Sequence, residues 1–194
     1  MPVYDAALDA NLDIVHVRHE AAAVHMADAW GRLTGEPGVA LLTGGPGHAN
    51  GLSALYTALA SESPMLLLSG EAPLAERHKG AFQEMRQAEL AAPLVKAAFT
   101  AQSARTLAAD LARAWRHARF GRPGPVYLGL PFDVLEEKFD EGESALPEAT
   151  AFAVKPIPLA ESAAQGVLAE IARAKRPLIL AGPASAATVR PAPP

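Results

Sequence analysis

VRHEAAAVHMADAWGRLTGEPGVALLTGGPGHANGLSAL, residues 17–55, is the stretch of this chain that decides its fold. A glutamate, Glu20, stands at the start of a helical pattern. A short apolar run, residues 39–42, then leads into the glycine-proline loop 44–47, and a second helical pattern follows. A helix, an unbroken apolar strand, a tight loop and another helix in this order indicate an α/β fold built on a parallel sheet.

The same alternation continues along the chain. Short aliphatic runs predict strands at residues 14–17, 39–42, 65–69, 97–100, 126–130 and 178–181. Helical patterns fill residues 20–33, 49–61, 104–120 and 161–174. Because the strands lack polar alternation and helices separate them, we predict a doubly wound parallel sheet, buried on both faces and joined by right-handed crossovers.

The composition along the chain predicts two domains. Residues 1–136 hold most of the strands and helices, and residues 137–158, rich in Glu, Pro and Ala, are expected to be a linker. Residues 159–194 carry one helix and one strand, which cannot bury a core alone, so we expect the beginning of a second α/β domain. Residues 1–11 look like a helix whose preceding strand is missing. We therefore expect a chain truncated at both ends.

Composition and charge exclude several classes of protein. The chain is 50% hydrophobic and 20% charged, which is too apolar for a disordered protein. It has no cysteine, so disulfides, thiolate metal sites and a cysteine nucleophile are excluded. A net charge of -4 argues against binding to nucleic acid. The chain has neither an apolar run of the roughly 18 residues that span a membrane nor a secretory signal, so a cytoplasmic protein is expected.

A glutamate in the first turn of a helix has two interpretations. In one, Glu20 only complements the positive end of the helix dipole. In the other, it is a functional carboxyl. The small residues 21–23 leave little room for local water, and we expect desolvation to raise the pKa of Glu20, so that it shares a proton with a ring nitrogen of a ligand.

Two loops carry the other candidate residues. The loop 44–47, with Asn50 behind it, is either an ordinary strand-to-helix turn or part of a binding site. It lacks the third glycine of G-x-G-x-x-G and the Gly-Lys-Ser/Thr of a P-loop. The second loop, GAFQE at residues 80–84, follows an expected strand, where α/β proteins place ligand contacts. Its alternative is a plain loop with one buried phenylalanine. His48 is expected to lie at the surface or to support the site from behind.

Four motifs occur together: RHE at 18–20, GGPGHAN at 44–50, AFQE at 81–84 and GRPGPV at 121–126. In combination they resemble the pyrimidine-binding domain of thiamine-diphosphate enzymes of the acetolactate synthase and 2-oxoacid decarboxylase superfamily. The resemblance covers about residues 1–135, and about 155–185 as the start of the family's central domain. One glycine of the first loop stands where the family usually has serine.

The resemblance implies a role for each candidate. In the family, the glutamate that matches Glu20 hydrogen-bonds a ring nitrogen of the cofactor's aminopyrimidine. This bond favours the imino tautomer, which removes the proton from the thiazolium carbon. Glu20 is therefore the expected catalytic residue. The expected cofactor-binding residues in the two loops are Gly45, Pro46, Asn50, Phe82 and Gln83.

The resemblance also implies cofactors and partners. Family members bind the diphosphate through Mg²⁺ in a separate domain that carries Gly-Asp-Gly, and this sequence has no Gly-Asp-Gly. No metal ligand is therefore assigned to this chain, and FAD stays open as a further cofactor of the full-length parent. The family's site lies between subunits, so we expect a homo-oligomer, a dimer or a tetramer, that acts on a small 2-oxo acid or an acyl-CoA.

The expected function is the N-terminal, cofactor-binding part of a thiamine-diphosphate-dependent lyase or transferase, similar to acetolactate synthase and inactive alone. Two alternatives stay open. The chain is a separate small subunit completed by a partner chain, or it is a non-catalytic binding or regulatory module of the same fold.

Overall fold

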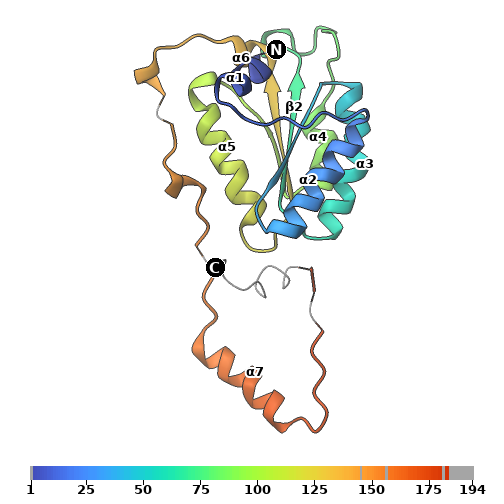
Figure 1. Ribbon diagram of the computed structural model, residues 1–194, viewed down its shortest axis with the longest axis vertical. Helices are drawn as coiled ribbons and strands as arrows, with labels where there is room; N and C mark the ends of the chain where they lie inside the picture. Colours follow the sequence, from blue (N-terminus) through green and yellow to red (C-terminus); the bar gives the residue numbers. More distant parts are fainter. Residues whose placement is uncertain (1, 145, 156, 181, 184–194) are drawn as a thin grey trace.

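The computed structural model describes residues 2–144, 146–155, 157–180 and 182–183 of the chain (Figure 1). The helices are α1 (Pro2–Asp9), α2 (Glu20–Thr34), α3 (Pro46–Ala60), α4 (Gln87–Ala91), α5 (Ala104–Arg119), α6 (Phe132–Glu136) and α7 (Glu161–Arg173). The strands are β1 (Gly38–Leu42), β2 (Met65–Glu71), β3 (Ala97–Thr100) and β4 (Pro125–Pro131).

The four described strands form one parallel sheet in the order β1-β2-β4-β3. Leu42 at the end of β1 pairs with Ser69 of β2, which pairs with Gly129 of β4, so the carboxyl ends of the strands meet at one edge. Helices α2, α3 and α4 cover one face of the sheet and α5 covers the other (Figure 1). The predicted doubly wound parallel sheet is confirmed.

Local signals explain where the helices begin and end. Helix α2 begins at Glu20 because Nδ1 of His19 accepts a hydrogen bond from the backbone N–H of Ala21 at 3.2 Å. It ends at Gly35, whose φ of 73° is left-handed. The hydroxyl of Ser103 caps α5 in the same way as His19 caps α2. The helices predicted from the sequence agree closely with α2, α3, α5 and α7.

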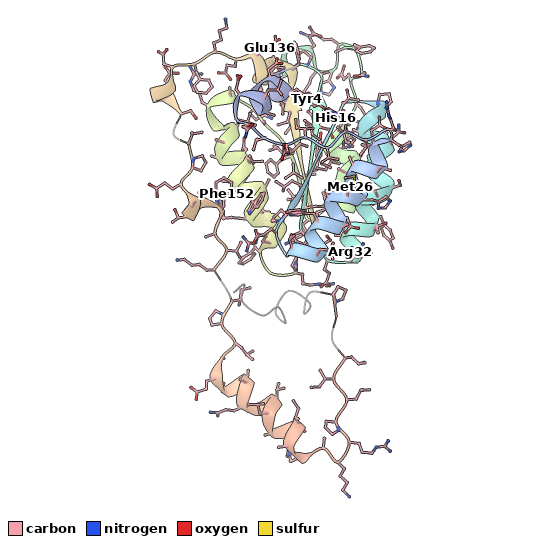
Figure 2. The ribbon with its side chains drawn as sticks, viewed as in Figure 1. Tyr4, His16, Met26, Arg32, Glu136 and Phe152 are labelled. Atoms are coloured by element: carbon pink, nitrogen blue, oxygen red, sulfur yellow. The ribbon has the colours of Figure 1, made fainter. Side chains whose placement is uncertain are left out.

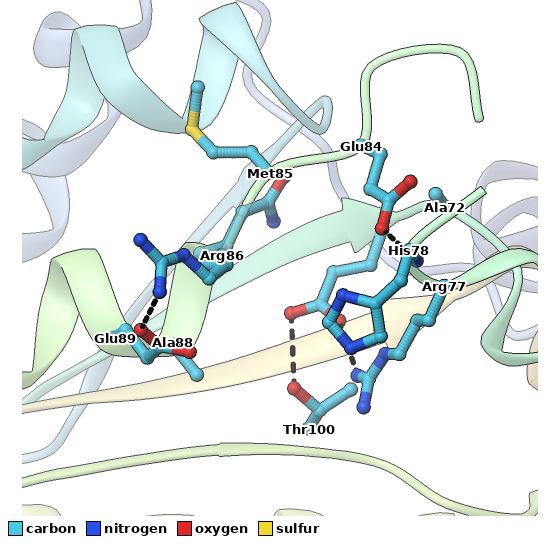
Figure 3. Close-up of a pocket in the computed structure, with 11 residues that line it drawn as sticks. Ala72, Arg77, His78, Glu84, Met85, Arg86, Ala88, Glu89 and Thr100 are labelled. Atoms are coloured by element: carbon cyan, nitrogen blue, oxygen red, sulfur yellow. Dashed lines mark hydrogen bonds and ion pairs between the residues drawn. The ribbon is translucent and has the colours of Figure 1, made fainter. Parts of the chain in front are cut away.

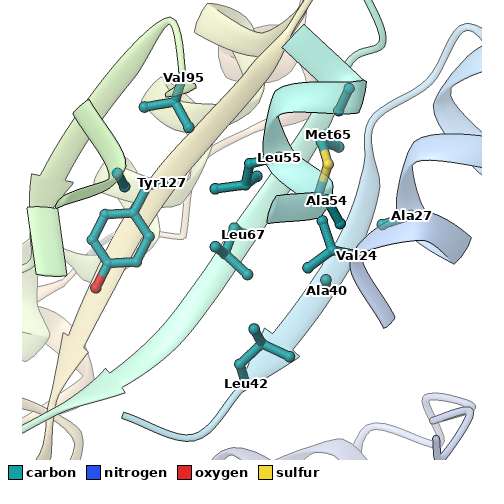
Figure 4. Close-up of a cluster of buried hydrophobic side chains, with 12 residues drawn as sticks. Val24, Ala27, Ala40, Leu42, Ala54, Leu55, Met65, Leu67, Val95 and Tyr127 are labelled. Carbon is teal, nitrogen blue, oxygen red and sulfur yellow. The ribbon is translucent and has the colours of Figure 1, made fainter. Parts of the chain in front are cut away.

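The largest buried cluster lies between the sheet and the helices α2 and α3 (Figure 4). Val24 of α2, Leu55 of α3 and Leu67 of β2 are fully buried in it. Burial of each such side chain stabilises the fold by about 1.5–3 kcal/mol. All residues of β4 are buried because this central strand has helices on both faces. The core therefore holds in place the strand ends that carry the candidate residues.

Two predicted strands are not formed. Residues 12–17 run without strand pairing, and Ile14 and Val15 are exposed. This segment crosses near α1, where the rings of Tyr4 and His16 stack with their centroids 6.1 Å apart (Figure 2). An aliphatic run becomes a strand only when a neighbouring strand satisfies its backbone, and residues 12–17 have no such neighbour in the described part of the chain. Residues 178–180 are likewise not a strand, and Ala181, the last residue of that prediction, lies outside the described residues.

The chain after α6, residues 137–152, contacts helix α5 at several points. The carboxylate of Glu137 accepts from the backbone N–H of Ala104 at 2.7 Å, and Arg105 pairs with Glu137 at 2.7 Å. Further along, the ring of Phe152 meets Trp115 of α5 edge-on at 6.2 Å (Figure 2). The predicted linker is therefore attached to α5 over part of its length. Helix α7 buries no residue and stands apart from the sheet (Figure 1).

Candidate functional site

The loop after β1 is a tight turn that only glycine can make. The N–H of Gly47 donates to the carbonyl of Gly44 at 3.3 Å, which closes a four-residue turn. Gly45, the first central residue, has φ 58° and ψ -119°, the conformation of a type II′ turn. A Cβ on Gly45 would lie 2.8 Å from Cβ of Gln83, so a larger residue would also collide with the second candidate loop. Pro46 follows as the first residue of α3.

The structure brings Glu20 against the other end of this turn. The side-chain N–H of Asn50 donates to Oε2 of Glu20 at 3.1 Å. A Cβ on Gly47 would lie 3.2 Å from Oε1 of Glu20 and 2.4 Å from a methyl carbon of Thr43. The absence of a side chain at Gly47 therefore leaves room for the methyl group of Thr43 and lets the carboxylate of Glu20 approach the turn. Glu20 and Asn50, thirty residues apart in sequence, meet across the first turns of α2 and α3.

The expected raised pKa of Glu20 is wrong. The backbone N–H of Glu20 itself, and then the amide of Asn50, hold the pKa of this carboxyl below its usual value. Desolvation acts in the opposite direction but is weaker, because the side chain is only partly buried. Glu20 is therefore an ionised hydrogen-bond acceptor at neutral pH, and not a carboxyl that carries its own proton.

The second candidate loop lies on the far side of the turn from Glu20. The backbone of Gln83 contacts Gly45, and Phe82 is 88% exposed, which excludes the alternative of a buried phenylalanine. The carboxylate of Glu84 shapes this loop by accepting from the backbone N–H groups of Gly80 at 2.9 Å and Ala81 at 3.1 Å. The loop thus presents Phe82 outward.

Two cavities lie at the carboxyl ends of the strands. The larger, about 310 Å³, is mostly apolar and is lined by Leu42, Gly44, Phe82, Gln83 and Leu130, among others. The smaller, about 180 Å³, is charged (Figure 3). In it Arg77 pairs with Glu71 at 3.2 Å, and the hydroxyl of Thr100 donates to the same carboxylate at 3.1 Å. Glu20 is not among the described residues that line either cavity.

Sequence reasoning missed a group of polar residues buried beneath the turn. Gln87 and His48 are both buried, and Nδ1 of His48 shares a hydrogen bond with the hydroxyl of Ser69 at 3.0 Å. Burial excludes the surface position expected as one possibility for His48, and the residue lies behind the turn, where it meets the ring of Tyr127 edge-on at 4.8 Å. Desolvation lowers the pKa of His48 from 6.5 to about 4. Hydrophobic periodicity carries no signal for such contacts, because each joins residues far apart in sequence.

Within the described residues, no cluster of three or more His, Asp or Glu side chains is placed to hold a metal ion. None of the helices described is both long and apolar enough to cross a bilayer.

Residues 1–90 match the family model of the N-terminal TPP binding domain of thiamine pyrophosphate enzymes. This part of the chain is therefore similar to that family. Over 93% of the chain it is 36% identical to "Acetolactate synthase, catabolic" from Raoultella terrigena, of which it covers 32%. It is 35% identical to a probable acetolactate synthase large subunit of Methanocaldococcus jannaschii, over 94% of the chain and 31% of the relative. It is also 36% identical to oxalyl-CoA decarboxylase of Escherichia coli K12, over 96% of the chain and 34% of the relative.

The chain therefore carries the N-terminal TPP-binding domain of acetolactate synthase-like enzymes, for which thiamine diphosphate is the cofactor. It spans about a third of the length of the relatives that it matches.

Proposed function

We propose that this chain is the cofactor-binding part of a thiamine-diphosphate-dependent lyase or transferase that acts on a 2-oxo acid or an acyl-CoA. The main support is the placement of Glu20, an ionised carboxylate held by Asn50 beside the glycine turn. Two of the relatives, an acetolactate synthase and an oxalyl-CoA decarboxylase, support the two substrate classes.

The residues present fit the pyrimidine half of this cofactor. A protonated ring nitrogen needs a carboxylate acceptor, which Glu20 provides, and Pro46 is the one residue of the neighbouring turn that carries a side chain. The cofactor, when bound, supplies the stabilisation of carbanions that this chemistry requires. No described cluster in this chain could hold Mg²⁺, and the proposal assigns the metal and the diphosphate to another part of the enzyme.

Each residue then has a distinct role in this proposal. Glu20 holds a proton on the ring nitrogen through a charge-assisted hydrogen bond. Its lowered pKa favours this arrangement, because a more acidic carboxyl leaves the proton on its partner. Asn50 fixes one carboxylate oxygen and leaves Oε1 facing Gly47. Gln83 contacts the other side of the turn, and Phe82 and Gln83 line the apolar cavity.

The test is Glu20→Gln in the complete enzyme. The rate of proton exchange at the thiazolium carbon of bound cofactor, followed by NMR, is expected to fall about 10²- to 10⁴-fold. The reason is that the neutral amide of glutamine has no charge with which to keep a proton on the ring nitrogen. Glu148→Gln, at an exposed position outside the sheet, is the matched control and is expected to leave the rate unchanged. An exchange rate in Glu20→Gln equal to that of the wild type, with cofactor binding demonstrated, would remove Glu20 from the mechanism.

The substrate class needs a separate assay. The complete enzyme is supplied with thiamine diphosphate, Mg²⁺ and either pyruvate or oxalyl-CoA, and product is measured. Turnover of one of these compounds that disappears in Glu20→Gln supports the reaction class. Failure with both, in an enzyme that still exchanges the thiazolium proton, would contradict the proposed substrates and leave the cofactor role intact.

A further inference from the structure

Gln87 lies directly beneath the glycine turn and connects three parts of the sheet. Its side chain is buried, with 2% of the residue exposed. Its Oε1 accepts from the backbone N–H of Gly45 at 2.6 Å. Its Nε2 donates to the carbonyl of Gly70 at 3.0 Å and to the hydroxyl of Tyr127 at 2.9 Å. One amide therefore links the loop after β1, the end of β2 and the central strand β4.

The orientation of this amide is set by a chain of hydrogen bonds. The hydroxyl of Tyr127 donates to the carboxylate of Glu71 at 2.7 Å. Since its single proton is used there, the hydroxyl can only accept from Gln87. The NH₂ group of Gln87 must then face Tyr127, and its oxygen must face Gly45. Gly129 makes room for the carboxylate, because a Cβ there would lie 2.0 Å from Oε1 of Glu71.

The turn that Gln87 holds is the one that borders Glu20. Gly45 has a backbone conformation that needs support, because its N–H points into a buried space where an unpaired donor is costly. Two residues later, Gly47 lets the carboxylate of Glu20 approach the turn, and Asn50, which donates to this carboxylate, follows on the same helix. A shift of the turn would therefore move the two contacts that the start of α3 makes with this carboxylate.

We propose that Gln87 is a positioning residue, which acts through the turn Gly44–Gly47 to set the place of the Glu20 carboxylate. The inference rests on the function proposed above and assigns a role that none of the four sequence motifs includes. Gln87 does not touch the carboxylate. Its effect is carried by the hydrogen bond to Gly45 and by the rigidity of the turn.

The first experiment reads the hydrogen bond directly and needs no cofactor. In the 194-residue chain, amide hydrogen exchange is measured by NMR for Gly45 and for residues of β4. Gln87→Met keeps the size of the side chain but removes all three hydrogen bonds. It is expected to accelerate exchange at Gly45 about tenfold more than in β4. Gln165→Met, at an exposed position of α7, is the matched control and is expected to change exchange neither at Gly45 nor in β4.

The second experiment uses the complete enzyme. Gln87→Met is expected to slow proton exchange at the thiazolium carbon about tenfold or more, since small misplacements of a catalytic group cost up to about 10² in rate. The affinity for the cofactor is expected to change less than the rate does.

Two results would overturn the inference. In the first, the Gln87→Met variant accelerates amide exchange at Gly45 no more than it accelerates exchange in β4. Equal acceleration would indicate a general loss of stability. The second is an unchanged rate of thiazolium proton exchange in Gln87→Met while Glu20→Gln abolishes exchange. In that second case the proposed function stands and only the role of Gln87 fails.

Discussion

The buried histidine beneath the turn makes the stability of this protein sensitive to mild acid. His48 has no exposed surface, and its Nε2 lacks a hydrogen-bond partner among the described residues. Desolvation, opposed in part by the backbone of Gln87, lowers the pKa of His48 from 6.5 to about 4. Because the folded chain resists protonation of His48, the unfolded chain binds this proton more tightly. The contribution of neutral His48 to the free energy of unfolding is therefore fully present above pH 6.5 and is lost as the pH falls toward 4.

The magnitude follows from the two pKa values. Each tenfold difference in proton affinity corresponds to about 1.4 kcal/mol, so the full effect is about 3 kcal/mol, of which about 2 kcal/mol falls between pH 7 and pH 5. The free energy of unfolding is measured by urea titration, followed by circular dichroism, at both pH values. His48→Gln cannot take up this proton, so its loss of stability over this range is expected to be about 2 kcal/mol smaller than that of the wild type.

The matched control is His25→Gln, at an exposed position of α2, which is expected to lose as much stability as the wild type. Other groups that titrate in this range, such as His117, whose pKa is lowered by partial burial and by nearby cations, contribute equally to all three proteins and cancel in the comparison. Parallel loss of stability in the wild type and in His48→Gln between pH 7 and pH 5 would refute the reasoning.

Two further predictions concern the turn and the exposed apolar residues. Backbone strain alone would cost Gly45→Ala about 1 to 3 kcal/mol of unfolding free energy. The expected loss is larger, because the added Cβ would also collide with Gln83 of the second candidate loop. Gly80→Ala, at positive φ but in open space, isolates the strain, and equal losses of unfolding free energy in urea for the two variants would contradict the argument. The chain is also expected to self-associate, preferably as a dimer, because Leu168, Ile171 and residues 178–180 are exposed. Light scattering on a size-exclusion column tests this expectation, and a sharp peak at the chain mass of 20.2 kDa at high concentration would oppose it.

The sequence alone was enough to locate the longer helices α2, α3, α5 and α7 and the four strands of the sheet, but not the short helices α4 and α6. Aliphatic runs such as residues 65–69 are bounded by proline or glycine, and helical runs such as 104–120 end where the polar and apolar period is lost. These signals are local, and the structure agrees with them. The prediction failed at residues 14–17, where an equally aliphatic run remains unpaired, because strand formation depends on a neighbour as well as on the segment itself.

The motifs also located the candidate loops, but not the environment of their residues. The three small residues after Glu20 predicted desolvation, whereas hydrogen bonds from its own backbone N–H and then from the amide of Asn50 dominate and lower its pKa. The hydrogen bond from Gly45 to Gln87 was equally beyond local reasoning. Composition, periodicity and short motifs describe neighbours along the chain. Hydrogen bonds and desolvation depend on neighbours in space, which this chain acquires only when the parallel sheet brings the ends of its strands to one edge.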